Sequence, residues 1–131
     1  MYQKELNISS GGFNMSATNH YRVIQPSGSL TFASSPQIMQ EFKSCLEANV
    51  KTVLIDLQNI DFIDSSGLGT LVSMHTKMRL AGGQLYLCSP KDQARSLLDI
   101  SDMDQIFEIY ASREEFDTHI NKNNMAVIVV K

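Results

Sequence analysis

The chain has 131 residues, which is enough for one domain with a single hydrophobic core, and its 43% hydrophobic and 19% charged residues are typical of a globular protein. The formal net charge of -3 disfavours nucleic acid as a partner, because nucleic acid binds clustered basic side chains and the eleven Lys and Arg residues are scattered. The amino terminus has no apolar targeting segment, and no apolar run approaches the roughly 18 residues that span a bilayer. We therefore expect a soluble, cytoplasmic protein that binds neither nucleic acid nor a membrane.

The two cysteines are predicted to be buried thiols. Cys45 and Cys88 lie far apart and lack the C-x-x-C spacing of zinc and redox sites, so the sequence indicates neither a disulfide nor a zinc site. Each falls within an apolar pattern, where a free Cys behaves as a small hydrophobic residue.

The amino-terminal part of the chain predicts a lead-in, a strand and a helix. Residues 1–19 have few large apolar side chains, which predicts a loosely ordered segment, with an edge strand at residues 6–8 as the alternative. Residues 21–25 read as the first strand, ended by Pro26, which cannot donate to a sheet ladder. A helix follows at Ser34-Ser35-Pro36, where either Ser can cap it and Pro suits the first helical position.

The central part predicts a buried strand, a turn and a second helix. Residues 52–57 are apolar and rich in β-branched side chains, as in a strand buried on both faces. Residues 59–62 are expected to turn, and apolar residues then recur at helical spacing from about Ser66. Gly82-Gly83 provides the helix stop.

The carboxy-terminal part repeats the alternation. Residues 85–88 predict a strand, and Ser89-Pro90 repeats the cap-and-proline signature of a helix start. Residues 106–110 predict another strand. Ser112-Arg113-Glu114-Glu115 matches a capping box, in which the Ser and a Glu three residues later bond each other's backbone N–H, so a helix is expected to begin there and end near Asn121.

This alternation predicts one α/β domain, a mostly parallel (mixed) sheet of four to five strands with about four helices packed on it. Residues 122–131 are left as an apolar extension that is too short for a membrane and strongly strand-forming. We expect it to add an edge strand to its own sheet. The alternative is that it pairs with a second chain as a homodimer, because open apolar edges recruit partners.

The segment Asp64-Ser65-Ser66-Gly67-Leu68-Gly69 is the candidate functional site. It lies between a strand and a helix, so its two serines fall at or just before a helix start. Helix starts carry unpaired N–H groups and partial positive charge, which suits a reversible phosphate. If Ser65 accepts the phosphate, Ser66 is the expected helix cap. A purely structural cap at Ser65 is the alternative.

The sequence does not favour an enzyme. A serine hydrolase needs a base beside the nucleophile, but G-x-S-x-G is absent, and the sequence places none of His20, His75 and His119 near the serines. His75 is expected to be a packed or half-exposed helix residue. The phosphate-binding patterns G-x-x-x-x-G-K-[ST] and G-x-G-x-x-G are also absent.

A resident metal is not favoured either, although Asp56, Asp61 and Asp64 offer oxygen ligands of the kind that hard cations take. Asp56 is expected near the exposed end of its strand and Asp61 in a turn, so only Asp64 borders the helix start. A Mg²⁺ that a kinase brings with its ATP is favoured over a resident ion, and we expect no cofactor.

The runs V-L-I-D-L at 53–57 and D-F-I-D-S-S-G-L-G at 61–69 resemble the signature of STAS domains, and the anti-sigma-factor antagonists are the most similar class. The resemblance implies a STAS domain at residues 20–121. It also implies that Ser65, directly after the Asp, is phosphorylated by a partner that is both a serine kinase and an anti-sigma factor, and that a metal-dependent serine phosphatase reverses the modification.

The resemblance places the partner-binding surface at this turn, with Asp64, Ser66, Gly67 and Leu68 beside Ser65. One departure concerns Thr31, which follows Gly28-Ser29-Leu30 where the family often has Asp, so the partner can differ from a sigma-regulating kinase. We also keep open a scaffold, or a module that binds a nucleotide or another anion at the helix start without phosphorylation.

Overall fold

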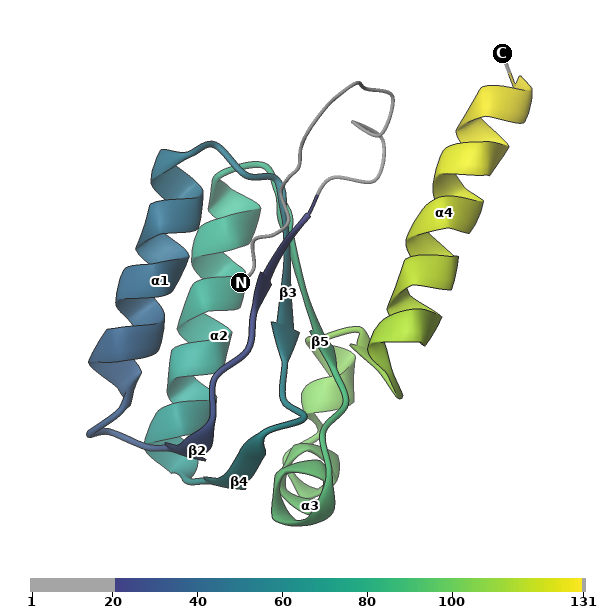
Figure 1. The fold of residues 1–131 in the computed structure, drawn as a ribbon. Coiled ribbons are helices and arrows are strands. Elements are labelled where there is room, and N and C mark those ends of the chain that lie inside the picture. The colour runs from purple at the N-terminus through teal and green to yellow at the C-terminus, as the bar shows by residue number, and fades with distance from the viewer. Residues whose placement is uncertain (1–20, 131) are drawn as a thin grey trace.

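The computed structural model describes residues 21–130, with side chains described as far as Asn121 (Figure 1). Strands and helices alternate along most of this part of the chain. In order, the elements are β1 Arg22–Ile24, β2 Gly28–Leu30, α1 Ser35–Glu47, β3 Thr52–Asp56, β4 Ile60–Ile63, α2 Ser65–Leu80, β5 Gln84–Cys88, α3 Asp92–Ile100, a 3-10 turn Met103–Gln105, β6 Ile109–Tyr110 and α4 Arg113–Val130.

The strands form two parallel sheets. The main sheet has four strands in the order β1-β3-β5-β6, and every recorded pair in it is parallel. The second sheet consists of β2 and β4, also parallel, which continue the chain beyond the carboxyl ends of β1 and β3 (Figure 1). The predicted α/β fold, with a mostly parallel sheet and four helices in the described residues, is confirmed.

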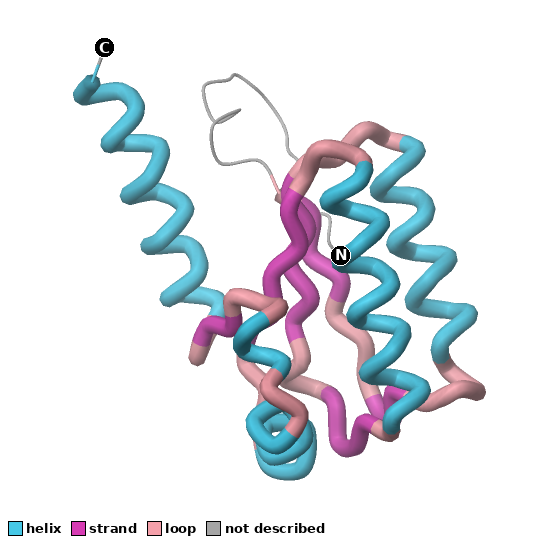
Figure 2. The backbone as a smooth tube through the Cα atoms, turned by 180° about the vertical axis from the view of Figure 1, so that it is seen from behind, coloured by secondary structure: helices cyan, strands magenta, loops and turns pink. Residues whose placement is uncertain are grey.

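The main sheet separates two apolar layers. In Figures 1 and 2, α1 and α2 lie side by side along one face, whereas α4 leaves from the other side. The central strand β3 supplies both layers because its side chains alternate: Val53 and Ile55 join the main core with α1, α2 and α3, and Leu54 joins a smaller cluster with Cys88 and Phe116. Each fully buried aliphatic side chain of this kind stabilises the fold by about 1.5–3 kcal/mol.

Strand β4 lies where the sequence predicted a turn, and β2 lies after Pro26, where no strand was predicted. Each is only three or four residues long, so neither shows the length of apolar alternation that predicts a strand. Leu30 and Ile63 point into the core and are paired in register, which gives these short strands an inner face. The predicted strand at 106–110 is shorter than expected, since only Ile109 and Tyr110 are extended.

The buried cysteines and one buried carboxylate lie within or beside the core. Cys45 and Cys88 are buried as predicted, and burial raises the pKa of the Cys88 thiol to about 12, which keeps it protonated and unreactive. Asp56 is only 1% exposed, so its expected position at an exposed strand end is wrong. Its carboxylate accepts hydrogen bonds from Gln25 Nε2 at 2.9 Å and from the Gln58 N–H at 3.0 Å.

The carboxy-terminal extension is helical, and the expected extra strand is wrong. The predicted capping box forms in part at the start of α4: Ser112 Oγ accepts from the Glu115 N–H at 3.0 Å, but Glu115 Oε1 accepts from the N–H of Ala111, at 2.9 Å, in place of that of Ser112. No Gly or Pro follows before Val130. The helix therefore continues, because it satisfies its own backbone groups, whereas a strand needs a neighbour. The alternative of a homodimer that pairs through a C-terminal strand loses its structural basis. The expected lead-in at residues 1–19 lies outside the described residues.

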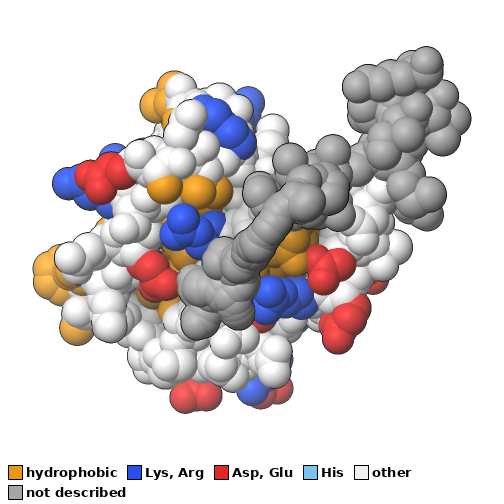
Figure 3. All heavy atoms as spheres, turned by 45° about the horizontal axis from the view of Figure 1, so that its top comes forward, with side chains coloured by type: hydrophobic (Ala, Val, Ile, Leu, Met, Phe, Trp, Pro, Cys, Tyr) orange, Lys and Arg blue, Asp and Glu red, His pale blue; other side chains and the backbone are white. Residues whose placement is uncertain are grey.

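The end of the molecule opposite the start of α2 carries interspersed charges. On the part of this end that Figure 3 shows in colour, blue and red side chains lie among white and orange ones. In the part of the chain that the structure describes, none of the helices combines the length and apolar character needed to cross a membrane.

Candidate functional site

The candidate site lies at the junction of β4 and α2, at the lower end of the molecule in Figure 1. Asp64 separates the two elements with an extended backbone (φ -102°, ψ -177°), and α2 begins at the next residue, Ser65. The Asp64 N–H donates to the Leu30 carbonyl of β2 at 3.3 Å, so the junction is attached to the neighbouring strand.

Asp64 is the cap of α2. Its Oδ1 accepts a hydrogen bond from the Gly67 N–H at 2.8 Å, and its carbonyl accepts from the Leu68 N–H at 2.9 Å. The expectation that Ser66 provides the cap is wrong, because the carboxylate one residue before the helix already occupies that role. Ser65 and Ser66 are both exposed, and neither hydroxyl has a hydrogen-bond partner among the described residues.

The two glycines of the motif have different environments. Gly67 is buried, and a Cβ built on it would lie 2.0 Å from the Leu30 carbonyl oxygen, so the close packing of α2 against β2 requires glycine. Gly69 is exposed, and a Cβ there would meet nothing within 4 Å. Leu68 is half-buried and packs against the main core.

Hydroxyl groups connect the loop after β2 to the first turns of α2. The Thr31 carbonyl accepts from Ser35 Oγ at 2.7 Å, Ser35 Oγ lies 2.7 Å from Thr70 Oγ1, and Thr70 Oγ1 donates to the Ser66 carbonyl at 3.0 Å. The structure therefore brings Thr31 to the same end of the molecule as Ser65 and Ser66. The sequence indicated Ser35 only as a possible helix cap, and it did not identify Thr70, which nothing distinguishes from an ordinary helix residue.

Gln93 of α3 is a further site residue that the sequence did not reveal. Its Oε1 accepts from the Ile63 N–H at 2.8 Å, and its Nε2 donates to the Ile63 carbonyl at 2.8 Å. Ile63 lies two residues before Ser65. A single glutamine thirty positions away leaves no periodic or motif signal, so only the tertiary contact identifies it.

Two large apolar side chains that are near site residues in the sequence are exposed: Phe32 follows Thr31, and Phe62 lies two residues before Asp64. Phe32, in the loop after β2, is 81% exposed, and Phe62 on β4 is 44% exposed. Phe62 is paired in register with Ser29, on the outward side of the small sheet, while the adjacent pair of Leu30 and Ile63 is buried.

The described histidines pack against aromatic rings. His75 lies 5.1 Å from the Phe107 ring, and burial, together with the charge of Arg79, lowers the pKa of His75, so its neutral form predominates at neutral pH. His119 packs against Tyr110 on α4. His20 lies outside the described residues.

The carboxylates that the sequence suggested as metal ligands are dispersed. Asp64 caps α2 and Asp56 is bonded to Gln25, while Asp61 is exposed on β4. Within the described residues, no group of three or more His, Cys, Asp and Glu is arranged to hold a metal ion.

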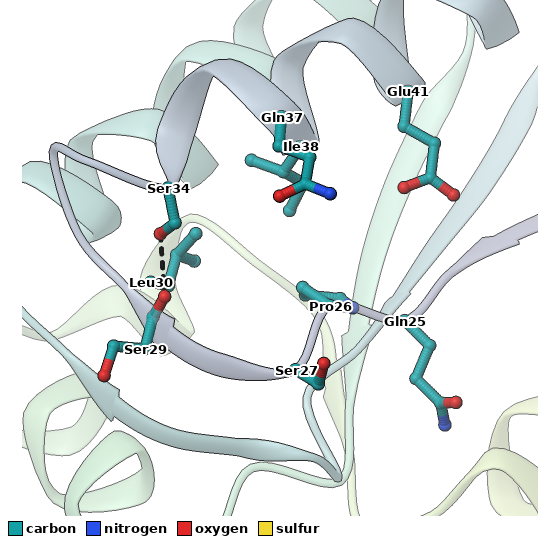
Figure 4. A pocket seen from close by; sticks show the side chains of 9 residues that line it. All are labelled: Gln25, Pro26, Ser27, Ser29, Leu30, Ser34, Gln37, Ile38 and Glu41. Atoms are coloured by element: carbon teal, nitrogen blue, oxygen red, sulfur yellow. Dashed lines mark hydrogen bonds between the residues drawn. The ribbon is translucent and has the colours of Figure 1, made fainter.

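A small pocket lies between the start of α1 and the connection from β1 to β2 (Figure 4). Its volume is about 170 Å³, below the roughly 300–1,000 Å³ that is usual for cofactor and ligand sites. Glu41 is the one charged residue among the nine that line it, and Ser34 crosses its edge with a 2.7 Å hydrogen bond to the Ser29 carbonyl. This lining offers no cation to an anionic ligand.

Comparison with known proteins finds a matching family model and relatives that share one kind of name. The family model described as "STAS domain" matches residues 13–116. BtrV of Bordetella bronchiseptica, a candidate anti-sigma factor antagonist by name, is 30% identical over 87 residues, which cover 66% of this chain and 75% of that protein. The anti-sigma F factor antagonist of Paenibacillus polymyxa is 26% identical over 95 residues, covering 70% of this chain and 81% of its own.

Among solved structures, the anti-sigma factor antagonist SpoIIAA has a similar fold. Its unphosphorylated form aligns with a TM-score of 0.64 at 22% identity, covering 76% of this chain and 87% of SpoIIAA. The phosphorylated form of the Bacillus protein aligns with a TM-score of 0.59, also at 22% identity, over 75% of this chain and 88% of its own.

Proposed function

The chain belongs to the STAS domain family, and on that premise we propose that it is an anti-sigma-factor antagonist whose partner binding is switched by phosphorylation of Ser65. In its unmodified form it binds a protein that combines the roles of serine kinase and anti-sigma factor. Phosphorylation by that partner releases it, and a serine phosphatase restores it. The names of the two curated relatives support this class of function.

The observation that carries the proposal is the availability of the Ser65 hydroxyl. Because Asp64 caps α2, the hydroxyl of Ser65 is exposed at the first helical position and makes no hydrogen bond within the described residues. It is therefore open to a kinase. In the transfer, Ser65 Oγ forms a bond to the γ-phosphorus of ATP, the bond to ADP breaks, and the hydroxyl proton passes to a base of the kinase, with Mg²⁺ held by the nucleotide.

The charges at the helix start allow the domain to remain folded after modification. A phosphate on Ser65 adds about -1.5 to -2 charges to a chain whose formal charge is -3. The N-terminus of α2 favours an anion by about 0.3–1 kcal/mol, which offsets repulsion from the nearby Asp64 carboxylate. The modification therefore acts on binding rather than on folding.

Phosphate on Ser65 disfavours a partner that is packed on this surface. The partner must desolvate the new dianion or move away from it, which is costly unless a cation is supplied. A loss of about 3 kcal/mol lowers affinity more than a hundredfold, which is sufficient for a switch. Exposed Phe32 and Phe62 and the open surface over Gly69 favour a protein partner, since apolar side chains and close backbone approach are common at protein interfaces.

The test is a pull-down in which Ser65→Ala and Ser65→Asp serve as bait, followed by incubation of the recovered kinase with the wild-type protein, ATP and Mg²⁺, and by mass spectrometry. We expect Ser65→Ala to retain the partner, Ser65→Asp to lose it, and the label to appear on Ser65. Ser66→Ala is the matched control, because Ser66 is also exposed and also lacks a side-chain hydrogen bond in the described part of the chain.

The proposal is wrong if the label appears on Ser66 in place of Ser65, or if Ser65→Asp binds the partner as tightly as the wild type does. A nucleotide- or anion-binding module at the start of α2 remains the second candidate from the sequence. The pocket in Figure 4 lies beside α1 and not at the start of α2, and its lining includes no Lys or Arg, so it adds no support to that candidate. Saturable binding of a nucleotide in the micromolar range, without kinase labelling, would revive that candidate.

A further inference from the structure

Gln93 acts on β4 as a neighbouring strand would. In the described residues, β4 pairs with β2 along one edge only. On the other edge, the carboxamide of Gln93 accepts from the Ile63 N–H and donates to the Ile63 carbonyl, both at 2.8 Å. A carboxamide has an N–H donor and a carbonyl acceptor, as a peptide group does. This side chain therefore makes the two hydrogen bonds to Ile63 that one residue of a neighbouring strand would make.

The helix that carries Gln93 is held in place independently. Ala94 and Leu98 of α3 are buried in the main core. The connection from β5 is also constrained, because Ser89 and Asp92 both have left-handed backbone conformations, with φ of 60° and 52°. Such conformations persist in L-residues when the surrounding structure fixes them. Gln93 therefore reaches β4 from a fixed support.

Ile63 connects the hydrogen bonds of Gln93 to the start of α2. It is the last residue of β4, and the next residue, Asp64, directs its carboxylate and carbonyl to the amides of Gly67 and Leu68. A shift in the Ile63 backbone displaces the cap and the first turn of α2, which carries Ser65. Gln93 does not contact Ser65, so its effect is indirect.

We propose that Gln93 is a positioning residue that fixes the first turn of α2 and thereby presents Ser65 to the kinase, so that α3 becomes an element through which the switch can be modulated. This inference rests on the proposed function for its kinase step, but its structural part does not require a partner.

The experiment measures amide hydrogen exchange in wild type, Gln93→Met and Gln93→Glu. Gln93→Met removes both hydrogen bonds, whereas Gln93→Glu keeps the side-chain length and loses the donor to the Ile63 carbonyl. Exchange of the Ile63 amide will rise in Gln93→Met simply because this amide loses its hydrogen-bond acceptor, Gln93 Oε1. The informative amides are those of Gly67 and Leu68, where we expect exchange about fivefold to tenfold faster in both variants, with β3 amides unchanged.

Gln40→Met is the matched control, because Gln40 is an exposed glutamine on α1 without a side-chain hydrogen bond in the described residues. We expect it to leave the Gly67 and Leu68 amides as in the wild type. With the kinase recovered by the Ser65→Ala bait, we expect the KM for the Gln93 variants to rise about tenfold and kcat to change less, since presentation rather than chemistry is altered. If Gln93→Met does not fold, Gln93→Glu alone decides the result.

Unchanged exchange at Gly67 and Leu68 in the folded variants overturns the inference, whether or not Ser65 is phosphorylated. Faster exchange with unchanged phosphorylation kinetics also overturns it, because the first turn would then be loosened without effect on the kinase. If the wild type itself is never labelled, the proposed function fails, and the exchange result by itself decides whether Gln93 fixes the α2 start.

Discussion

The two glycines of the site provide a matched pair of substitutions within one helix, and we expect Ala to have opposite effects at them. At Gly67, the added Cβ would lie 2.0 Å from the Leu30 carbonyl oxygen and 2.7 Å from the carbonyl carbon, whereas ordinary contacts begin at 3.4 Å. Both atoms belong to the backbone of β2, which cannot rotate away as a side chain can. At Gly69 the Cβ would enter open space.

The expected magnitudes follow from two opposing terms. Replacing Gly by Ala within a helix stabilises it by about 1 kcal/mol, and this gain applies at both positions. Overpacking costs about 1–3 kcal/mol or more, and at Gly67 it separates α2 from β2 and strains the hydrogen bond from Asp64 to Leu30. Because the 2.0 Å contact is with backbone, the cost lies at the upper end of this range, about 3 kcal/mol, and we expect Gly67→Ala to lower the free energy of unfolding by about 2 kcal/mol. Gly69→Ala should raise it by up to about 1 kcal/mol.

Urea denaturation followed by circular dichroism measures both variants under the same conditions, and comparison of the slopes confirms that each unfolds in the same manner as the wild type. A Gly67→Ala protein as stable as the wild type, or more so, would show that the close approach of α2 and β2 is not a constraint. A destabilised Gly69→Ala protein would show that the exposed glycine has a structural role. If Gly69→Ala is stabilised but binds the partner more weakly, the open surface over Gly69 is a contact.

Three further predictions concern the cap, the exposed surface and the pH dependence of stability. Asp64→Ala should lower the free energy of unfolding by about 1 kcal/mol in urea denaturation, and Asp64→Asn should restore most of it, since Asn also caps helices; equal losses in both would contradict the capping role. Phe32→Ala and Phe62→Ala should each weaken partner binding by about tenfold in calorimetry with little change in stability. The control Ile100→Ala should bind normally, because Ile100 is as exposed as Phe32 but lies at the end of α3. Burial in the folded state lowers the pKa of His75 below its ordinary value of 6.5. The neutral, buried imidazole therefore contributes fully to stability above pH 6.5, and this contribution is lost as the pH falls towards and through the pKa of the folded state. Thermal melts of His75→Met between pH 5 and 8 should therefore show a shallower acid-side loss than the wild type, and identical pH profiles would refute this assignment.

Local patterns in the sequence were sufficient for the α/β class and for the central elements of the fold. The apolar β-branched run at 52–57 and the helical spacing after Ser66 predicted β3 and α2, and burial of Cys45 and Cys88 followed from their apolar neighbours. These features depend on residues close together in the chain. Residues 122–130 were assigned wrongly because strand propensity alone cannot supply the neighbouring strand that a β conformation needs, whereas the helix begun at Ser112 satisfies its own hydrogen bonds.

The site shows the same division. The sequence by itself determined that a carboxylate, two hydroxyls and two glycines stand between a strand and a helix, because their order along the chain is all that this requires. Only the tertiary structure decided that Asp64 caps the helix and leaves Ser65 available, that Leu30 requires glycine at Gly67, and that Gln93 restrains β4 from α3. The contacts of Leu30 and Gln93 join residues about thirty or more positions apart, so they exist only when the folded core brings separate elements together.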